Sequence, residues 1–160
     1  GAAVCATAIV CINHRTHWFA LIEDVERKTY GTIFYCLSIC CLIFFFWSSC
    51  PGAMLAGALV MAISDGLASL IGRFVQSPKW HLYGQTKSLA GTSAMLLSTL
   101  GIISVVQLSI GPGLSMPQIL TISMVITGLE QLSGYGIDNL SVPVATASMI
   151  GLISEWPKTT

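Results

Sequence analysis

An acidic residue within an apolar run is the first feature of this sequence that could do chemistry. Asp65 lies inside AISDGLASLIGRFVQ (residues 62–76), which otherwise has the composition of a membrane-spanning helix. A charged side chain in such a helix costs at least about 2.5–3.5 kcal/mol on insertion scales, so it usually has a partner or a function. One interpretation is an ion pair with Lys87 or Arg73 that only holds helices together; the other is a functional site.

Small residues follow Asp65 on the same face of the predicted helix. Ala68, Ser69 and Gly72 come at the i+3, i+4 and i+7 positions relative to Asp65, which places them on one face. Small side chains allow another backbone or a ligand to come close. Helix packing alone would explain Ala68 and Gly72, but it would not explain the acid.

A second motif, GQTKSLAGTSAM, begins the next apolar run. We expect Thr86 or Ser88 to be a helix N-cap, with Lys87 in the first turn and Gly91 one turn further on. A helix N-terminus with free N–H groups, hydroxyls and a lysine suits an anion, phosphate above all. The segment is not a Walker A motif, because the glycines that this motif requires before the lysine are absent.

Carboxylates close to a phosphate site indicate a magnesium ion. Mg²⁺ usually binds through one or two carboxylates together with substrate phosphates. We predict Asp65 and Asp138 as metal ligands, with Glu130 or Asn139 in support. The pattern therefore favours metal-dependent phosphate chemistry, and a net charge of +0 offers no basic field for nucleic acid.

Composition places these residues in a membrane protein. The chain of 160 residues is 54% hydrophobic and only 9% charged, whereas a soluble domain carries about 25% charged residues. We expect an all-α, polytopic helical membrane protein forming a single domain over residues 1–160, because helices satisfy every backbone group internally. A truncated first helix would precede about five full spans, at Tyr30–Trp47, Gly52–Ile71, Ala90–Ile110, Gln118–Leu132 and Leu140–Trp156.

Alternate threading of these spans sorts the basic residues by side. The loops at 14–29, 72–88 and 133–139 fall on one side, and they hold every lysine and arginine except Lys158. The positive-inside rule makes that side cytoplasmic, or stromal in a plastid. Asp65, Glu130 and Asp138 are expected near the same face.

Three ordered segments resemble the polyprenol kinase family, with the greatest likeness to its phytol kinase branch. The segments are ISDGLASLIGRF, GQTKSLAGTSAM and LEQLSGYGIDNLSVPVATA. They match the family motifs Asp-Gly-x-Ala-x-x-x-Gly-Arg, Lys-Ser-x-x-Gly-Ser/Thr and Asp-Asn-Leu-Thr/Ser-Val-Pro. The likeness extends from about Glu23 to Met149, and the family's N-terminal helices lie outside it.

The resemblance implies a kinase that moves the γ-phosphoryl group of CTP, with Mg²⁺, onto a long isoprenoid alcohol. Its partners would be membrane lipid and the prenol, with other membrane subunits as further candidates, in a plastid (thylakoid or envelope) or cyanobacterial membrane. One carboxylate, with Glu130 as the candidate, would accept the hydroxyl proton. The resemblance implies catalytic roles for Asp65, Lys87, Glu130 and Asp138 and nucleotide-binding roles for Gly72, Arg73, Ser88, Gly91 and Asn139.

Two alternatives to a kinase remain open at the level of sequence. The family usually continues its first motif as Gly-Arg-Arg-Phe-Gly, whereas Phe74 and Gln76 stand here in place of the second arginine and the last glycine. This departure leaves room for a non-catalytic membrane subunit of a larger, for example photosynthetic, complex. A cytidylyltransferase that makes CDP-lipids is the more distant alternative, since related spacings occur there.

Overall fold

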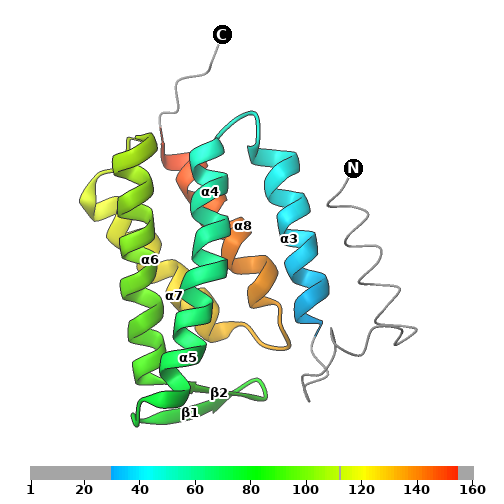
Figure 1. Ribbon diagram of the computed structural model, residues 1–160, viewed down its shortest axis with the longest axis vertical. Helices are drawn as coiled ribbons and strands as arrows, with labels where there is room; N and C mark the ends of the chain where they lie inside the picture. Colours follow the sequence, from blue (N-terminus) through cyan, green and yellow to red (C-terminus); the bar gives the residue numbers. More distant parts are fainter. Residues whose placement is uncertain (1–29, 112, 155–160) are drawn as a thin grey trace.

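The computed structural model describes residues 30–111 and 113–154, which form a helical bundle with a short β-hairpin at one end (Figure 1). A continuous helix, Pro51–Phe74, consists of α4, the π-helical segment η1 and α5. The elements in chain order are α3 (Gly31–Phe46), α4 (Pro51–Leu59), η1 (Val60–Asp65), α5 (Gly66–Phe74), β1 (Lys79–Leu82), β2 (Gln85–Ser88), α6 (Leu89–Ile110), α7 (Met116–Leu132) and α8 (Asp138–Ile153).

Local sequence explains where several helices begin and end. Pro51 occupies the first turn of α4, where the missing N–H is no loss. Helix α6 ends at Gly111, whose φ of 65° is a left-handed conformation that favours glycine. Helix α7 begins with a capping box in which Ser115 and Gln118 satisfy each other's backbone N–H groups.

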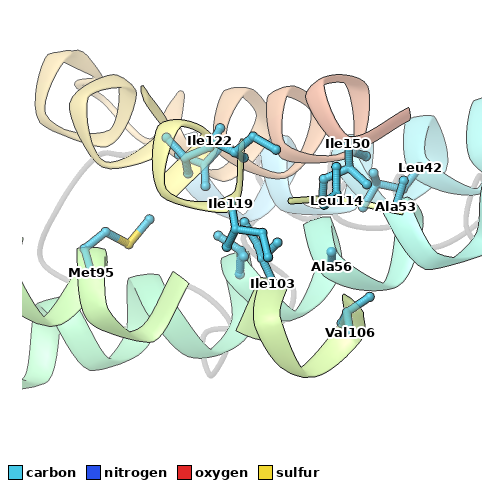
Figure 2. Packing of buried hydrophobic residues seen from close by; sticks show 14 of the residues in the cluster. Leu42, Ala53, Ala56, Met95, Ile103, Val106, Leu114, Ile119, Ile122 and Ile150 are labelled. Atoms are coloured by element: carbon cyan, nitrogen blue, oxygen red, sulfur yellow. The ribbon is translucent and has the colours of Figure 1, made fainter. Parts of the chain in front are cut away.

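The core is apolar and lies between helices that are neighbours in the bundle. Helix α8 packs against α3, α4 and α7, while α6 packs against α5 and α7. Branched aliphatic side chains and methionine fill the centre, as Figure 2 shows. The largest fully buried hydrophobic side chains are Leu42, Val60, Met95, Ile103, Ile119, Ile122, Ile126, Val142 and Ile150.

Helix α4 approaches α8 closely at Gly57. A Cβ atom on Gly57 would lie 2.5 Å from the main-chain oxygen of Pro143, so only glycine fits there without a shift. Pro143 lies inside α8 and cannot donate a backbone hydrogen bond to the preceding turn. The contact joins the two helices in the apolar half of the bundle.

Two helices in the described residues are long and apolar enough to cross a membrane. They are Pro51–Phe74 and Leu89–Ile110, and only 33% and 28% of their most apolar windows are buried. The helices Gly31–Phe46 and Asp138–Ile153 are apolar but shorter. The predicted number of five full spans is therefore not confirmed by helix length and composition, and the truncated first helix lies outside the described residues.

The predicted polar loop at 72–88 contains a β-hairpin, so the prediction of an all-α fold is wrong in this segment. Strands β1 and β2 pair antiparallel, with Leu82 opposite Gln85. Tyr83 and Gly84 connect them with φ values of 47° and 75°, the pattern of a type I′ turn that matches the twist of paired strands. Lys87 consequently lies in a strand and not in the first turn of α6, where the sequence had placed it.

Candidate active site

A pocket of about 290 Å³ lies at the hairpin end of the bundle, among the end of η1, α5, the hairpin, the start of α6, the end of α7 and the start of α8. Figure 1 shows the hairpin and the loop that joins α7 to α8 at the same end of the bundle. Three acidic and three basic side chains line the pocket together with polar and small residues. The lining consists of Asp65, Ala68, Ser69, Gly72, Arg73, Lys79, Gln85, Thr86, Lys87, Ser88, Gly91, Thr92, Glu130, Gln131 and Asp138.

The three acids come from three different elements and converge. One oxygen from each of Asp65, Glu130 and Asp138 lies within 4.8 Å of the others. Asp65 ends the π-helical segment η1, a type of helix irregularity often found at functional sites. An all-oxygen set of carboxylates is the donor set that Mg²⁺ prefers. The described residues therefore fit the predicted metal, and Glu130 joins the cluster as closely as Asp65 and Asp138 do.

Lys87 neutralises one of these acids. Its ammonium group forms an ion pair with Glu130 Oε1 and also donates to the main-chain oxygen of Glu130 at 3.1 Å. The Gln131 side-chain amide donates to Glu130 Oε2. Both carboxylate oxygens of Glu130 thus accept hydrogen bonds within the protein, so its predicted role as proton acceptor would require one of these bonds to open.

The start of α8 holds Asp138 at the pocket. The backbone N–H of Asn139 donates to Asp138 Oδ1 at 3.0 Å, and the Asn139 side-chain amide donates to the Gly31 carbonyl at 3.2 Å. Asn139 is not among the pocket-lining residues. Its contacts fasten α8 to the beginning of α3 and orient the neighbouring carboxylate, whereas the sequence analysis gave it a nucleotide-binding role.

Ser88 is the N-cap of α6, as the motif predicts, but the amides beyond it are not free. Leu89 N–H donates to the Pro78 carbonyl at 3.0 Å, and Ala90 N–H donates to Ser77 Oγ at 3.2 Å. Gly91 N–H donates to Ser88 Oγ at 3.1 Å. The expectation of a helix N-terminus with free donors for phosphate is therefore wrong, because the chain entering the hairpin already supplies acceptors.

Basic side chains remain as the groups that could bind phosphate. Arg73 and Lys79 both line the pocket. Within residues 30–111 and 113–154, the ion pair in this region joins Lys87 to Glu130, and neither Arg73 nor Lys79 is paired with a carboxylate. An arginine fork and a lysine ammonium are the usual partners of phosphate oxygens.

Gly72 and Gly91 bring α5 and α6 together beside the pocket. A Cβ atom on Gly72 would lie 2.8 Å from Ser88 Oγ, and one on Gly91 would lie 2.8 Å from the Ala68 carbonyl oxygen. Both glycines line the pocket, and helix packing accounts for their small size, so their nucleotide-binding roles stay predictions. The predicted face of Asp65, Ala68, Ser69 and Gly72 does line the pocket, with α6 as the backbone that approaches it.

Sequence reasoning missed several lining residues. Gln85 lines the pocket from β2, and Lys79 does so from β1, where it pairs with Ser88. Thr86, which the sequence offered only as a helix cap, also lines it from β2. Lys79–Leu82 alternates polar and apolar residues before Tyr83-Gly84, but Gln85–Ser88 is polar throughout, so the sequence signal for a hairpin is weak. Gln131 has no sequence signal, because its contribution depends on its contact with Glu130.

Sequence comparison shows homology to a known enzyme. The chain is 37% identical over 150 residues to a phytol kinase from the cyanobacterium Synechocystis sp., a match that covers 91% of this chain and 64% of the relative. The chain thus spans less than two thirds of the length of the curated relative it matches. No family model and no solved structure gives a significant match.

Fold, pocket and homology together define a helical protein with a pocket lined by three carboxylates and three basic side chains. The identity spans nearly the whole chain, including the segments that supply Asp65, Lys87 and Asp138. This homology supports membership of the polyprenol kinase family, of which phytol kinase is a member.

Proposed function

We propose that this protein is a membrane-bound kinase that phosphorylates a long isoprenoid alcohol, of the phytol type, with CTP as the phosphoryl donor. The observation that carries the proposal is the convergence of three carboxylates within 4.8 Å in a pocket that also holds Arg73 and Lys79. Such a pocket offers oxygen ligands for Mg²⁺ and cationic side chains for phosphates. The homologous phytol kinase supports the prenol as acceptor.

The pocket residues divide the work of phosphoryl transfer. Bound Mg²⁺ would be held by Asp65, Asp138 and Glu130, and it would neutralise charge on the transferred phosphoryl group. Arg73 and Lys79 would contact phosphate oxygens, and Lys87 would keep Glu130 in place. The alcohol oxygen forms a bond to the γ-phosphorus while the bond to the β-phosphate oxygen breaks, and CDP leaves. The hydroxyl proton passes to Asp65 or Asp138, whose side chains are not paired with Lys87.

The surrounding surface fits a membrane and a prenyl substrate. Large apolar side chains are exposed along the bundle, including Phe44, Leu108 and Leu152 at 80%, 86% and 86% exposure. Exposure of this extent suits lipid contact, because contiguous apolar surface is rare on soluble monomers. The prenyl chain would lie among lipids and helices, with only its hydroxyl at the pocket.

The basic residues indicate the orientation that we propose. All three lysine and arginine residues of the described part of the chain, Arg73, Lys79 and Lys87, lie at the pocket end. The positive-inside rule then places the pocket at the cytoplasmic or stromal face of a cyanobacterial or plastid membrane. The homology to phytol kinase does not favour a non-catalytic subunit, although such a subunit is one outcome of the following test.

Phosphorylation of phytol by membranes containing the full-length protein tests this proposal. With CTP and Mg²⁺ we expect phytyl monophosphate, and we expect Asp65→Asn to reduce the rate by at least about a hundredfold, the usual scale for loss of an electrostatic catalytic group. Ser49→Ala is the control, because its exposed hydroxyl lies beyond the end of α3, away from the pocket. No product with any prenol, from a protein that accumulates normally, would contradict the kinase and favour the non-catalytic subunit. Full activity of Asp65→Asn would contradict the site.

A further inference from the structure

The α7–α8 loop is clamped between the hairpin and the start of α3. On one side, a Cβ atom on Gly134 would lie 2.8 Å from Tyr83 Cβ and 3.2 Å from the Tyr83 carbonyl oxygen. On the other side, a Cβ atom on Gly136 would lie 2.7 Å from both the nitrogen and the Cα of Gly31. The loop therefore has no room for even a methyl group at either contact.

The Tyr83–Gly134 contact joins the two segments that carry most of the pocket charges. Gly134 lies midway in the sequence between Glu130 and Asp138, two of the three clustered acids. Tyr83 lies in the hairpin turn, and Lys87 lies in β2, the strand that follows this turn. Lys87 in turn binds Glu130, so the hairpin contacts the loop at its turn and the end of α7 through the ion pair.

The hairpin turn is built to present this contact. Tyr83 has a φ of 47°, a left-handed conformation that a non-glycine residue seldom adopts. Its aromatic ring is not what meets Gly134 most closely, since the two nearest atoms are Cβ and the main-chain oxygen, and the residue is 59% exposed. The fit therefore depends on the path of the backbone at residue 83 and on the absence of a side chain at residue 134.

We propose that the contact between Tyr83 and Gly134 is a positioning contact that sets the spacing of the three carboxylates. The hairpin turn presses on the middle of the loop, and the loop fixes Glu130 and Asp138 relative to Asp65. Neither Tyr83 nor Gly134 lines the pocket, so both act through their neighbours. The inference rests on the proposed function for its kinetic consequence, but its effect on cation binding can be measured without any kinase activity.

Gly134→Ala is the substitution that tests this contact, with Gly128→Ala as the matched control. Gly134 is not among the glycines with positive φ, so the new methyl group is opposed by Tyr83 and not by backbone strain. Gly128 lies on α7, and a Cβ atom there meets nothing within 4 Å. Tyr83→Gly removes the nearest opposing atom and suits the left-handed backbone. The pair Tyr83→Gly with Gly134→Ala should therefore recover much of what Gly134→Ala loses.

Binding of Mn²⁺, which substitutes for Mg²⁺ at oxygen ligands, provides the readout on the purified full-length protein by electron paramagnetic resonance. We expect Gly134→Ala to weaken Mn²⁺ binding by about tenfold, which is the scale seen when a residue that positions the metal ligands is substituted. Gly128→Ala should bind like the unsubstituted protein, and the double variant should bind within about threefold of Tyr83→Gly alone, because the two substitutions are coupled. If the Gly134→Ala protein does not accumulate, accumulation of the double variant with Tyr83→Gly shows the same rescue by removal of the opposing side chain.

Several outcomes would overturn the inference. Equal Mn²⁺ affinity of Gly134→Ala and Gly128→Ala would show that the contact does not position the acids, and so would a double variant as weak as Gly134→Ala. The expected Mn²⁺ pattern without any phosphorylation of a prenol would support the positioning contact and contradict the proposed function. Absence of Mn²⁺ binding by the unsubstituted protein would contradict both.

Discussion

The α4–α8 contact and the α5–α6 contact both depend on glycine, but they lie in different halves of the molecule. Gly57 faces Pro143 in the apolar half, where a Cβ atom would also approach Leu42 and Ala147 side chains at 3.4 Å. Gly72 and Gly91 face each other beside the charged pocket. The first contact lies in the core, whereas the second also fixes the end of α6 that carries Ser88.

The difference teaches how a motif glycine should be interpreted. In the sequence, Gly72 and Gly91 belong to motifs that suggest phosphate binding, and Gly57 belongs to none. In the structure all three glycines allow a neighbouring helix to approach closely. A glycine near a ligand site can therefore be explained by the packing that builds the site, and the groups that carry charge have to be identified separately.

The largest effect on stability is expected from Gly57→Ala. The new methyl group would meet the Pro143 carbonyl at 2.5 Å, and a main-chain oxygen within a helix cannot rotate away. We expect a loss of about 3 kcal/mol in the free energy of unfolding, at the upper end for overpacking, with little change in activity per folded molecule. Unfolding of the detergent-solubilised protein measures this loss. Gly101→Ala, with nothing within 4 Å of its Cβ, should stay within about 1 kcal/mol of the unsubstituted protein.

Gly91→Ala should have a smaller effect on stability and a larger effect on activity. Its methyl group would meet the Ala68 carbonyl at 2.8 Å and Ser88 Oγ at 3.1 Å, so the start of α6 has to shift. We expect a loss of about 2 kcal/mol in stability and a fall of at least about tenfold in kcat, because small displacements of catalytic groups are costly. Prenol kinase assays normalised to folded protein separate the two effects. Equal losses of activity for Gly57→Ala and Gly91→Ala would contradict the view that only the α5–α6 contact positions the pocket.

Much of the candidate site follows from the sequence. Asp65 drew attention because a carboxylate in an apolar helix is costly, and the alternation of spans brought Glu130 and Asp138 to the same end. The structure places all three in one cluster with Lys87 and Arg73 in the same pocket. The prediction that these residues lie near one another is confirmed, and Asp65 could be singled out because burial energy is a local property of the chain. Their catalytic and metal-binding roles stay predictions.

Other features could not be derived, because they depend on contacts between distant segments. The amides at the start of α6 are occupied by Pro78 and Ser77, which belong to the chain before the hairpin. Asn139 contacts Gly31, which is far away in the sequence. The hairpin itself was missed because its strands are too short for a period-two pattern to stand out beside the long helices.

The smallest effect concerns Gly72 and Ser88, and it tests whether this pair differs from Gly57 and Pro143 as argued. The atom nearest to a Cβ on Gly72 is Ser88 Oγ at 2.8 Å, a hydroxyl that can rotate but would then lose its bond to Gly91 N–H. Gly72→Ala and Ser88→Ala should each cost about 1 kcal/mol of stability, the usual value of a lost N-cap. The double variant should cost no more than Ser88→Ala alone, because removing the hydroxyl also makes room for the methyl group. If the stability losses of the two single variants add in the double variant, Gly72 is constrained by something other than the cap. If Ser88→Ala raises the KM for CTP without a loss of stability, Ser88 is a phosphate ligand.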